Sequence, residues 1–62
     1  MTRKEFCEIM AAGHEEAAKS LRISAKRAKK SGLLEHWLKL PPLVAQEEAL
    51  ARAFRDLAKE QE

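Results

Sequence analysis

The sequence has few cysteine, glycine, proline and aromatic residues. Its 62 residues include one cysteine, two glycines, two prolines and three aromatic residues. One cysteine cannot form an internal disulfide, and no segment alternates apolar and polar residues as a half-buried strand does. No apolar run approaches the roughly 20 residues of a membrane span. We therefore expect a helical protein without a membrane partner, acting in the cytoplasm, where a single thiol stays reduced.

Large apolar side chains are also scarce. The chain is 45% hydrophobic, but alanine supplies eleven of these residues. A domain of about 60 residues buries only about 60% of the surface that its unfolded chain exposes. A core this thin predicts that the chain pairs with a copy of itself, as a homodimer.

The first half of the sequence predicts one long helix over residues 3–30. Thr2 and Glu5 have the spacing of a capping box, and no proline follows until Pro41. Ser31 and Gly32 then provide a stop signal, because glycine adopts the left-handed conformation that ends helices. Apolar and small residues recur at steps of three and four and predict the packed face: Phe6, Ile9, Met10, Gly13, Ala17, Leu21, Ala25 and Ala28.

The second half predicts a short connecting helix over residues 33–40 and a second long helix beginning at Pro42. The residue before a proline avoids the helical conformation, so Leu40 should end the short helix. Leu43, Leu50 and Leu57 are seven residues apart and, with Phe54, predict the packed seam of the last helix. The predicted fold is all-α: residues 1–62 form one domain, a helical hairpin that dimerises into a helix bundle.

Positive charge is concentrated in one segment. The net charge is only +2, yet residues 19–32 carry six basic residues and no acidic one. These residues are Lys19, Arg22, Lys26, Arg27, Lys29 and Lys30. Such a basic helix predicts contacts with the phosphates of DNA or RNA, and we expect a regulatory nucleic-acid-binding protein. The alternative is a solvated face whose last bases complement the helix dipole.

Residues 16–24, with the sequence EAAKSLRIS, resemble the helix–turn region of helix-turn-helix DNA-binding proteins. The resemblance implies that Ile23 is buried in a turn, that Ser24 caps a recognition helix, and that Lys26, Arg27, Lys29 and Lys30 face DNA. One continuous helix with Ile23 on its surface is the alternative.

The residues needed for catalysis or metal binding are few and poorly spaced. Cys7 and His14 lie two helical turns apart, about 10 Å along the axis, so they cannot touch within one helix. Together with His36, they show none of the short spacings of metal ligands. We expect no enzyme activity, no metal and no cofactor.

A second functional hypothesis is a small inhibitor or adaptor, of the kind encoded by phages and plasmids, that binds an acidic protein surface. Its anchors would be apolar side chains, with the basic residues steering the approach. The anchor residues are Ile23, Trp37, Leu38 and Leu40.

Overall fold

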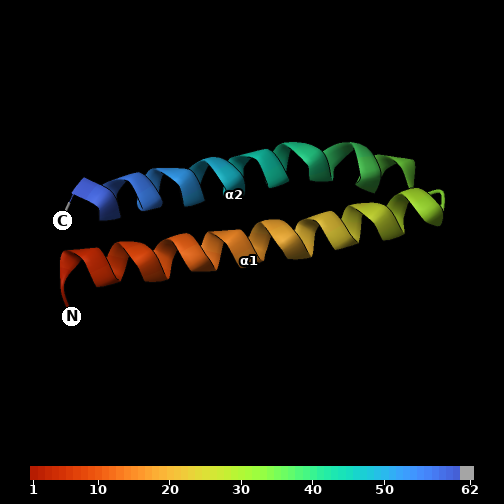
Figure 1. The fold of residues 1–62 in the computed structure, drawn as a ribbon. Coiled ribbons are helices and arrows are strands. Elements are labelled where there is room, and N and C mark those ends of the chain that lie inside the picture. Colours follow the sequence, from red (N-terminus) through yellow and green to blue (C-terminus); the bar gives the residue numbers. More distant parts are fainter. Residues whose placement is uncertain (61–62) are drawn as a thin grey trace.

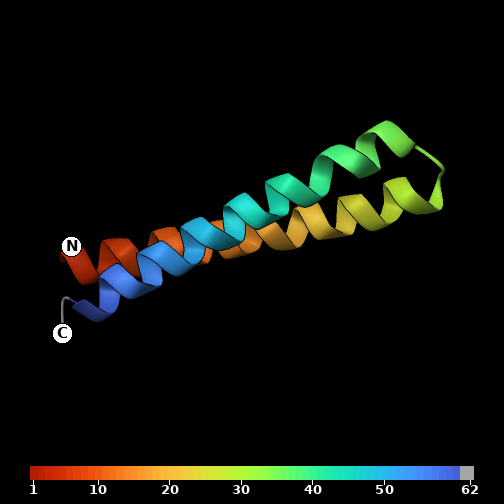
Figure 2. The same ribbon diagram turned by 90° about the horizontal axis from the view of Figure 1, so that it is seen from above.

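Two long helices lie antiparallel and form a hairpin in the computed structural model, which describes residues 1–60 (Figure 1). Helix α1 spans Arg3–Lys30 and helix α2 spans Leu34–Glu60. The described chain contains no strand, which confirms the all-α fold and the hairpin. The Cα atoms extend over 46 × 15 × 11 Å. The chain start and the end of α2 therefore share one end of a rod, and the connecting turn forms the other (Figure 2).

The predicted start of α1 is confirmed. The Glu5 backbone N–H donates to Oγ1 of Thr2 at 3.1 Å, and the Thr2 N–H donates to Oε1 of Glu5 at 3.2 Å. This reciprocal pair is the capping box, which satisfies two backbone donors that a helix start leaves free.

The end of α1 is also where the sequence predicts it. Gly32 has a φ of +75°, a left-handed conformation that side chains other than glycine rarely adopt. The Leu33 N–H donates to the Ala28 carbonyl at 2.9 Å and the Gly32 N–H to the Lys29 carbonyl at 3.3 Å. These two bonds form a Schellman motif, which turns the chain directly into α2.

The contact between the helices is a seam of small residues with a heptad period. Its positions on α1 are buried or half-buried at alternating steps of three and four: Cys7, Ala11, His14, Ala18, Leu21, Ala25 and Ala28. On α2 they are Trp37, Leu40, Val44, Glu47, Ala51, Phe54 and Ala58. The residues that are buried outright are all alanine, cysteine or valine. A 3.5-residue repeat makes two helices wind around each other, and small side chains let them approach closely.

The predicted packed faces were therefore partly wrong. Phe6 and Ile9 are about half exposed, and the leucines at 43, 50 and 57 are 45%, 36% and 43% exposed. Leu21, Ala25, Ala28 and Phe54 do lie in the seam. The physical reason is that the helices come closest along the line of smallest side chains, which leaves the bulkier residues beside the seam.

The separate connecting helix was also wrong, because α2 continues through Pro41 and Pro42. An internal proline lacks an N–H donor and costs about 3 kcal/mol or more. Here the seam continues on both sides of the prolines, with Trp37 and Leu40 before them and Val44 after them. Packing against α1 outweighs the local preference of the Leu40–Pro41 step, while both proline rings lie exposed.

The helix-turn-helix resemblance does not describe the structure, because α1 is continuous through Ile23 and Ser24. Ile23 is 46% exposed instead of buried in a turn. Two features keep the helix intact: strong helix formers surround this position, and Ala18, Leu21 and Ala25 hold it against α2 on both sides. The alternative of one helix with a surface isoleucine is confirmed.

Candidate nucleic-acid interface

All six predicted basic residues are exposed, and they lie in the half of α1 next to the turn. Two of them already have partners within the hairpin. Nη2 of Arg22 lies 2.5 Å from Oε2 of Glu48, and Nζ of Lys29 lies 5.2 Å from the centroid of the Trp37 ring. A cation over an aromatic face is attracted by the negative charge density of the ring.

The other four basic residues have no partner among residues 1–60, and they share one side of α1. At 100° per residue, they fall together with Ile23 inside an arc of about 100° on the side of the helix away from α2. We call Lys19, Lys26, Arg27 and Lys30 the cationic side. It is about 16 Å long at 1.5 Å per residue. Its charges are thus free to meet an external anion.

The hairpin separates charge along its length. Residues 17–52, the half that contains the turn, carry eight lysines and arginines against three glutamates. In the other half, residues 1–16 and 53–60 carry four basic residues against six acidic ones. Folding thus converts a nearly neutral chain into a rod with a positive turn end and a negative open end.

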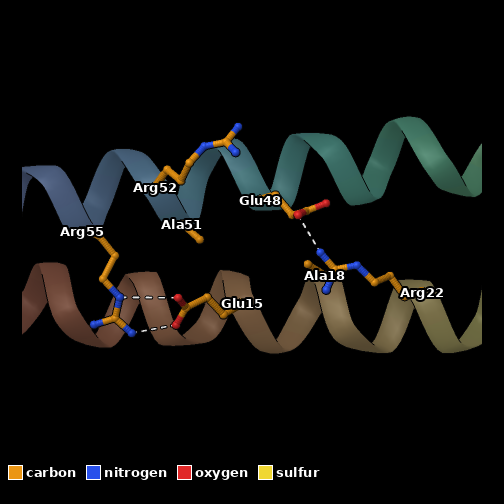
Figure 3. A pocket seen from close by; sticks show the side chains of 7 residues that line it. All are labelled: Glu15, Ala18, Arg22, Glu48, Ala51, Arg52 and Arg55. Atoms are coloured by element: carbon orange, nitrogen blue, oxygen red, sulfur yellow. Dashed lines mark hydrogen bonds and ion pairs between the residues drawn. The ribbon is translucent and has the colours of Figure 1, made fainter.

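One flank of the seam carries ion pairs between the helices (Figure 3). Nη2 of Arg55 donates to Oε1 of Glu15 at 2.6 Å, and Nε donates to Oε2 at 3.5 Å. The second ion pair, between Arg22 and Glu48, lies two turns further along α1. Because the Arg55 guanidinium donates to the carboxylate, it lowers the pKa of Glu15, and Glu15 in turn raises the pKa of Arg55.

These ion pairs border a shallow pocket of about 260 Å³ with Ala18 and Ala51 at its floor. Figure 3 shows the Arg52 side chain pointing away from α1 at the rim, whereas the other charged side chains point toward their partners. Because its other two arginines are paired with glutamates, this pocket offers an anion little free charge. The ion pairs at its border join the two helices.

A polar pair occupies the middle of the seam. Nδ1 of His14 lies 2.5 Å from Oε2 of Glu47, and both side chains are about one-quarter exposed. The His14 ring also stacks on Phe54, with centroids 5.7 Å apart and ring planes 9° from parallel. Within residues 1–60, no group of three or more His, Cys, Asp or Glu residues could hold a metal ion. Because each partner comes from a different helix, the pair can be made in only one register of the two helices.

Sequence analysis missed this pair, although a signal was present. His14 and Glu47 both stand at seam positions of a heptad repeat that runs through alanines. A polar residue at such a position calls for a partner opposite it.

The four apolar anchors expected for a protein partner do not form one surface. Trp37 and Leu40 are half-buried in the seam, whereas Ile23 lies on the cationic side of α1. Leu38 is 62% exposed near the turn, and it has two similarly exposed neighbours in Leu33 and Leu34. The exposed apolar surface near Trp37 is thus the turn end of the hairpin, without Ile23.

Comparison of the chain with protein families, curated proteins and solved structures finds no match. Neither helix of the described hairpin is long and apolar enough to cross a membrane.

Proposed function

We propose that this protein is a non-enzymatic regulator that binds DNA or RNA through the cationic side of α1. The observation that carries the proposal is a group of four basic side chains on one exposed side of α1 that have no partner within the described hairpin. Each phosphate that they neutralise releases condensed counterions, which gives affinity without base contacts. Arg27 adds a planar guanidinium that can bind a phosphate through two parallel hydrogen bonds.

The contacts of Arg22 and Lys29 within the hairpin favour different roles for the six predicted residues. Lys19, Lys26, Arg27 and Lys30 are the primary phosphate contacts in this proposal. Arg22 and Lys29 are secondary contacts, because each must leave its partner within the hairpin before it can bind a phosphate.

Two further statements belong to the same proposal. The protein acts as a homodimer, since among residues 1–60 no large side chain is fully buried and a second copy would supply the missing core. It acts in the cytoplasm, where its single thiol, Cys7, stays reduced.

The salt dependence of binding tests the proposal. Four phosphate contacts predict that log K falls with log salt with a slope of about −3.6 for duplex DNA and about −2.8 for single strands. The measurement is fluorescence anisotropy of a labelled DNA duplex and a labelled RNA strand, titrated with protein between about 50 and 200 mM salt.

The decisive comparison uses two variants with the same change in net charge. Lys26→Glu with Lys30→Glu should lower affinity at least tenfold and flatten the salt slope. Arg52→Glu with Lys59→Glu changes two exposed basic residues of α2 and should keep most of the affinity and the slope. Equal losses in both variants, or no binding by the unsubstituted protein at low salt, would contradict the proposal.

A protein partner is the second candidate, favoured by the apolar turn end. Leu33, Leu34 and Leu38 are 57%, 61% and 62% exposed, next to basic residues of α1. This combination suits an acidic surface with an apolar pocket. Cross-linking in host extract should then yield one defined adduct, which Leu34→Ser with Leu38→Ser should abolish and Ile23→Ser should not.

A further inference from the structure

One long side of the described hairpin carries bulky apolar residues that packing between the two helices leaves largely exposed. On α1, Phe6, Met10, Gly13 and Ala17 lie beside the seam within an arc of about 60°. Glu15 and Arg22, which form the ion pairs with α2, lie on the opposite flank.

The same division holds on α2. Leu43, Leu50 and Leu57 lie beside the seam, opposite the flank of Glu48 and Arg55. Because the ion pairs join one flank of α1 to one flank of α2, the two remaining flanks also share a side. We call this side the leucine face: Phe6, Met10, Gly13, Ala17, Leu43, Leu50 and Leu57.

The leucine face is left uncovered by the hairpin. Phe6 is 51% exposed, although its ring contacts Phe54 edge to face at 6.5 Å. The leucines are 36–45% exposed. Single exposed apolar residues are ordinary, but a row of them at heptad spacing on one face marks a contact surface.

Gly13 is a second and independent observation on this face. Glycine in the middle of a helix is unfavourable, because it restricts a flexible backbone and contributes no side chain. A Cβ atom added at Gly13 would meet nothing within 4 Å. The hairpin itself therefore has no steric need for glycine at position 13. A second helix that packed closely against this face would need a residue without a side chain there.

The size and symmetry of the face fit a second copy of the chain. With Cα extents of 46 by 15 Å, one side of the rod is comparable to the roughly 800 Å² that each partner buries in a standard interface. Leu43 and Leu57 are each one heptad from Leu50. A two-fold axis at Leu50 therefore places Leu43 of one copy against Leu57 of the other.

The charge distribution selects the orientation. When two rods lie antiparallel, the positive turn half of each meets the negative open half of the other. A parallel arrangement would bring like charges together. We propose that two copies pack antiparallel through the leucine face, centred on Leu50, as a four-helix bundle with both cationic sides outward. This inference rests on the homodimer of the proposed function and specifies its interface.

The mass of the unsubstituted chain in solution is the first test, made without nucleic acid. Light scattering at micromolar concentration should give twice the chain mass of 7.0 kDa, and the thermal midpoint should rise with protein concentration. A mass of one chain with a concentration-independent midpoint would overturn both the homodimer and its interface, and it would leave nucleic-acid binding to be tested separately.

Substitutions then test the face. Leu50→Glu should convert dimers to monomers, whereas Leu38→Glu, at a more exposed leucine outside the face, should not. Gly13→Leu guards against simple misfolding, because leucine favours helix and has open space in the isolated hairpin. It should keep the helical circular dichroism signal and still give monomers. Dimers that persist in both Leu50→Glu and Gly13→Leu would refute the face.

Cysteine cross-linking tests the orientation, in a background with Cys7→Ala. Leu50→Cys alone should form a linked dimer on oxidation, because the two copies of this position meet on the axis. Leu57→Cys alone should not, but Leu43→Cys with Leu57→Cys should. Linkage by Leu57→Cys alone, without linkage by Leu50→Cys, would overturn the antiparallel arrangement.

Discussion

Enlarging one alanine of the seam should destabilise the hairpin more than the loss of any of its surface ion pairs. Ala18 is 2% exposed and shares the floor of the Figure 3 pocket with Ala51 of α2, which is 5% exposed. Ala18→Leu adds three carbon atoms at a buried position of the seam. Because Ala18 is buried against α2, the added atoms must push the helices apart or turn into the shallow pocket, where they crowd the two ion pairs.

The expected cost follows from this lack of space. Overpacking a well-packed site lowers the free energy of unfolding by about 1–3 kcal/mol. Moving the helices apart would also stretch the two ion pairs that flank Ala18, Glu15–Arg55 and Arg22–Glu48. Each kcal/mol lowers the melting temperature of a 60–100-residue domain by about 4–8 °C.

Thermal and urea unfolding followed by circular dichroism would measure this effect, at one fixed protein concentration. Ala12→Leu is the matched control, because Ala12 lies exposed on the same helix. Leucine and alanine have similar helix propensities, so the control should change stability by less than about 0.5 kcal/mol. If Ala18→Leu matched its control or raised stability, the close alanine contact would be refuted.

Three further outcomes follow from the contacts between the helices. Because the pKa of Glu15 is lowered by Arg55, the pair stabilises the fold above the ordinary glutamate pKa of about 4.3, and this contribution is lost as pH falls through the lower folded-state value. Glu15→Gln should therefore cost a little stability at pH 7 and nothing in strong acid, as urea titrations at several pH values would show; a pH-independent difference would contradict the pair. Glu47→Ala should lower the free energy of unfolding by about 1–3 kcal/mol, because it leaves the half-buried imidazole of His14 without its partner. Calorimetry that found an unchanged melting temperature for this variant would refute the contribution of the pair. Lys29→Met should shift the fluorescence emission of Trp37, because it removes the charge 5.2 Å from the ring; an unchanged spectrum would place that lysine elsewhere.

The two ends of α1 could be predicted from the sequence because local chemistry determines them. Thr2 and Glu5 form their cap within one turn, and Gly32 meets a backbone requirement that few other residues can meet. Neither feature depends on the partner helix. The predicted bounds of α1 accordingly agree with the structure.

The packed faces could not be predicted by looking for bulk, because this seam is built from small residues. Both the bulky row through Phe6 and the small row through Cys7 and Ala11 satisfy helical periodicity. Only the longer 3–4 repeat, sustained over the whole helix, separates them. The expectation that a helix ends before Pro41 failed for a different reason. It considers only neighbouring residues, whereas the contacts of Trp37 and Val44 with α1 join residues far apart in the sequence.

The candidate site was predicted in part. The position of the six basic residues near the turn followed from charge counting alone. Charge counting could not tell which of them have a partner in the described part of the chain, because Arg22 pairs with a carboxylate on the other helix. Ion pairs between helices depend on register, and the register follows from a seam that the sequence analysis had not identified.

The separation of charge between the two ends of the hairpin has a consequence before any contact is made. A rigid, elongated body with opposite charges at its ends experiences a torque in the electric field of a polyanion. It rotates so that the turn leads and the open end of the described hairpin trails. In the antiparallel dimer proposed above the two charge separations would cancel, so this alignment would act only on a single hairpin that meets a polyanion, and added salt would weaken it together with the attraction.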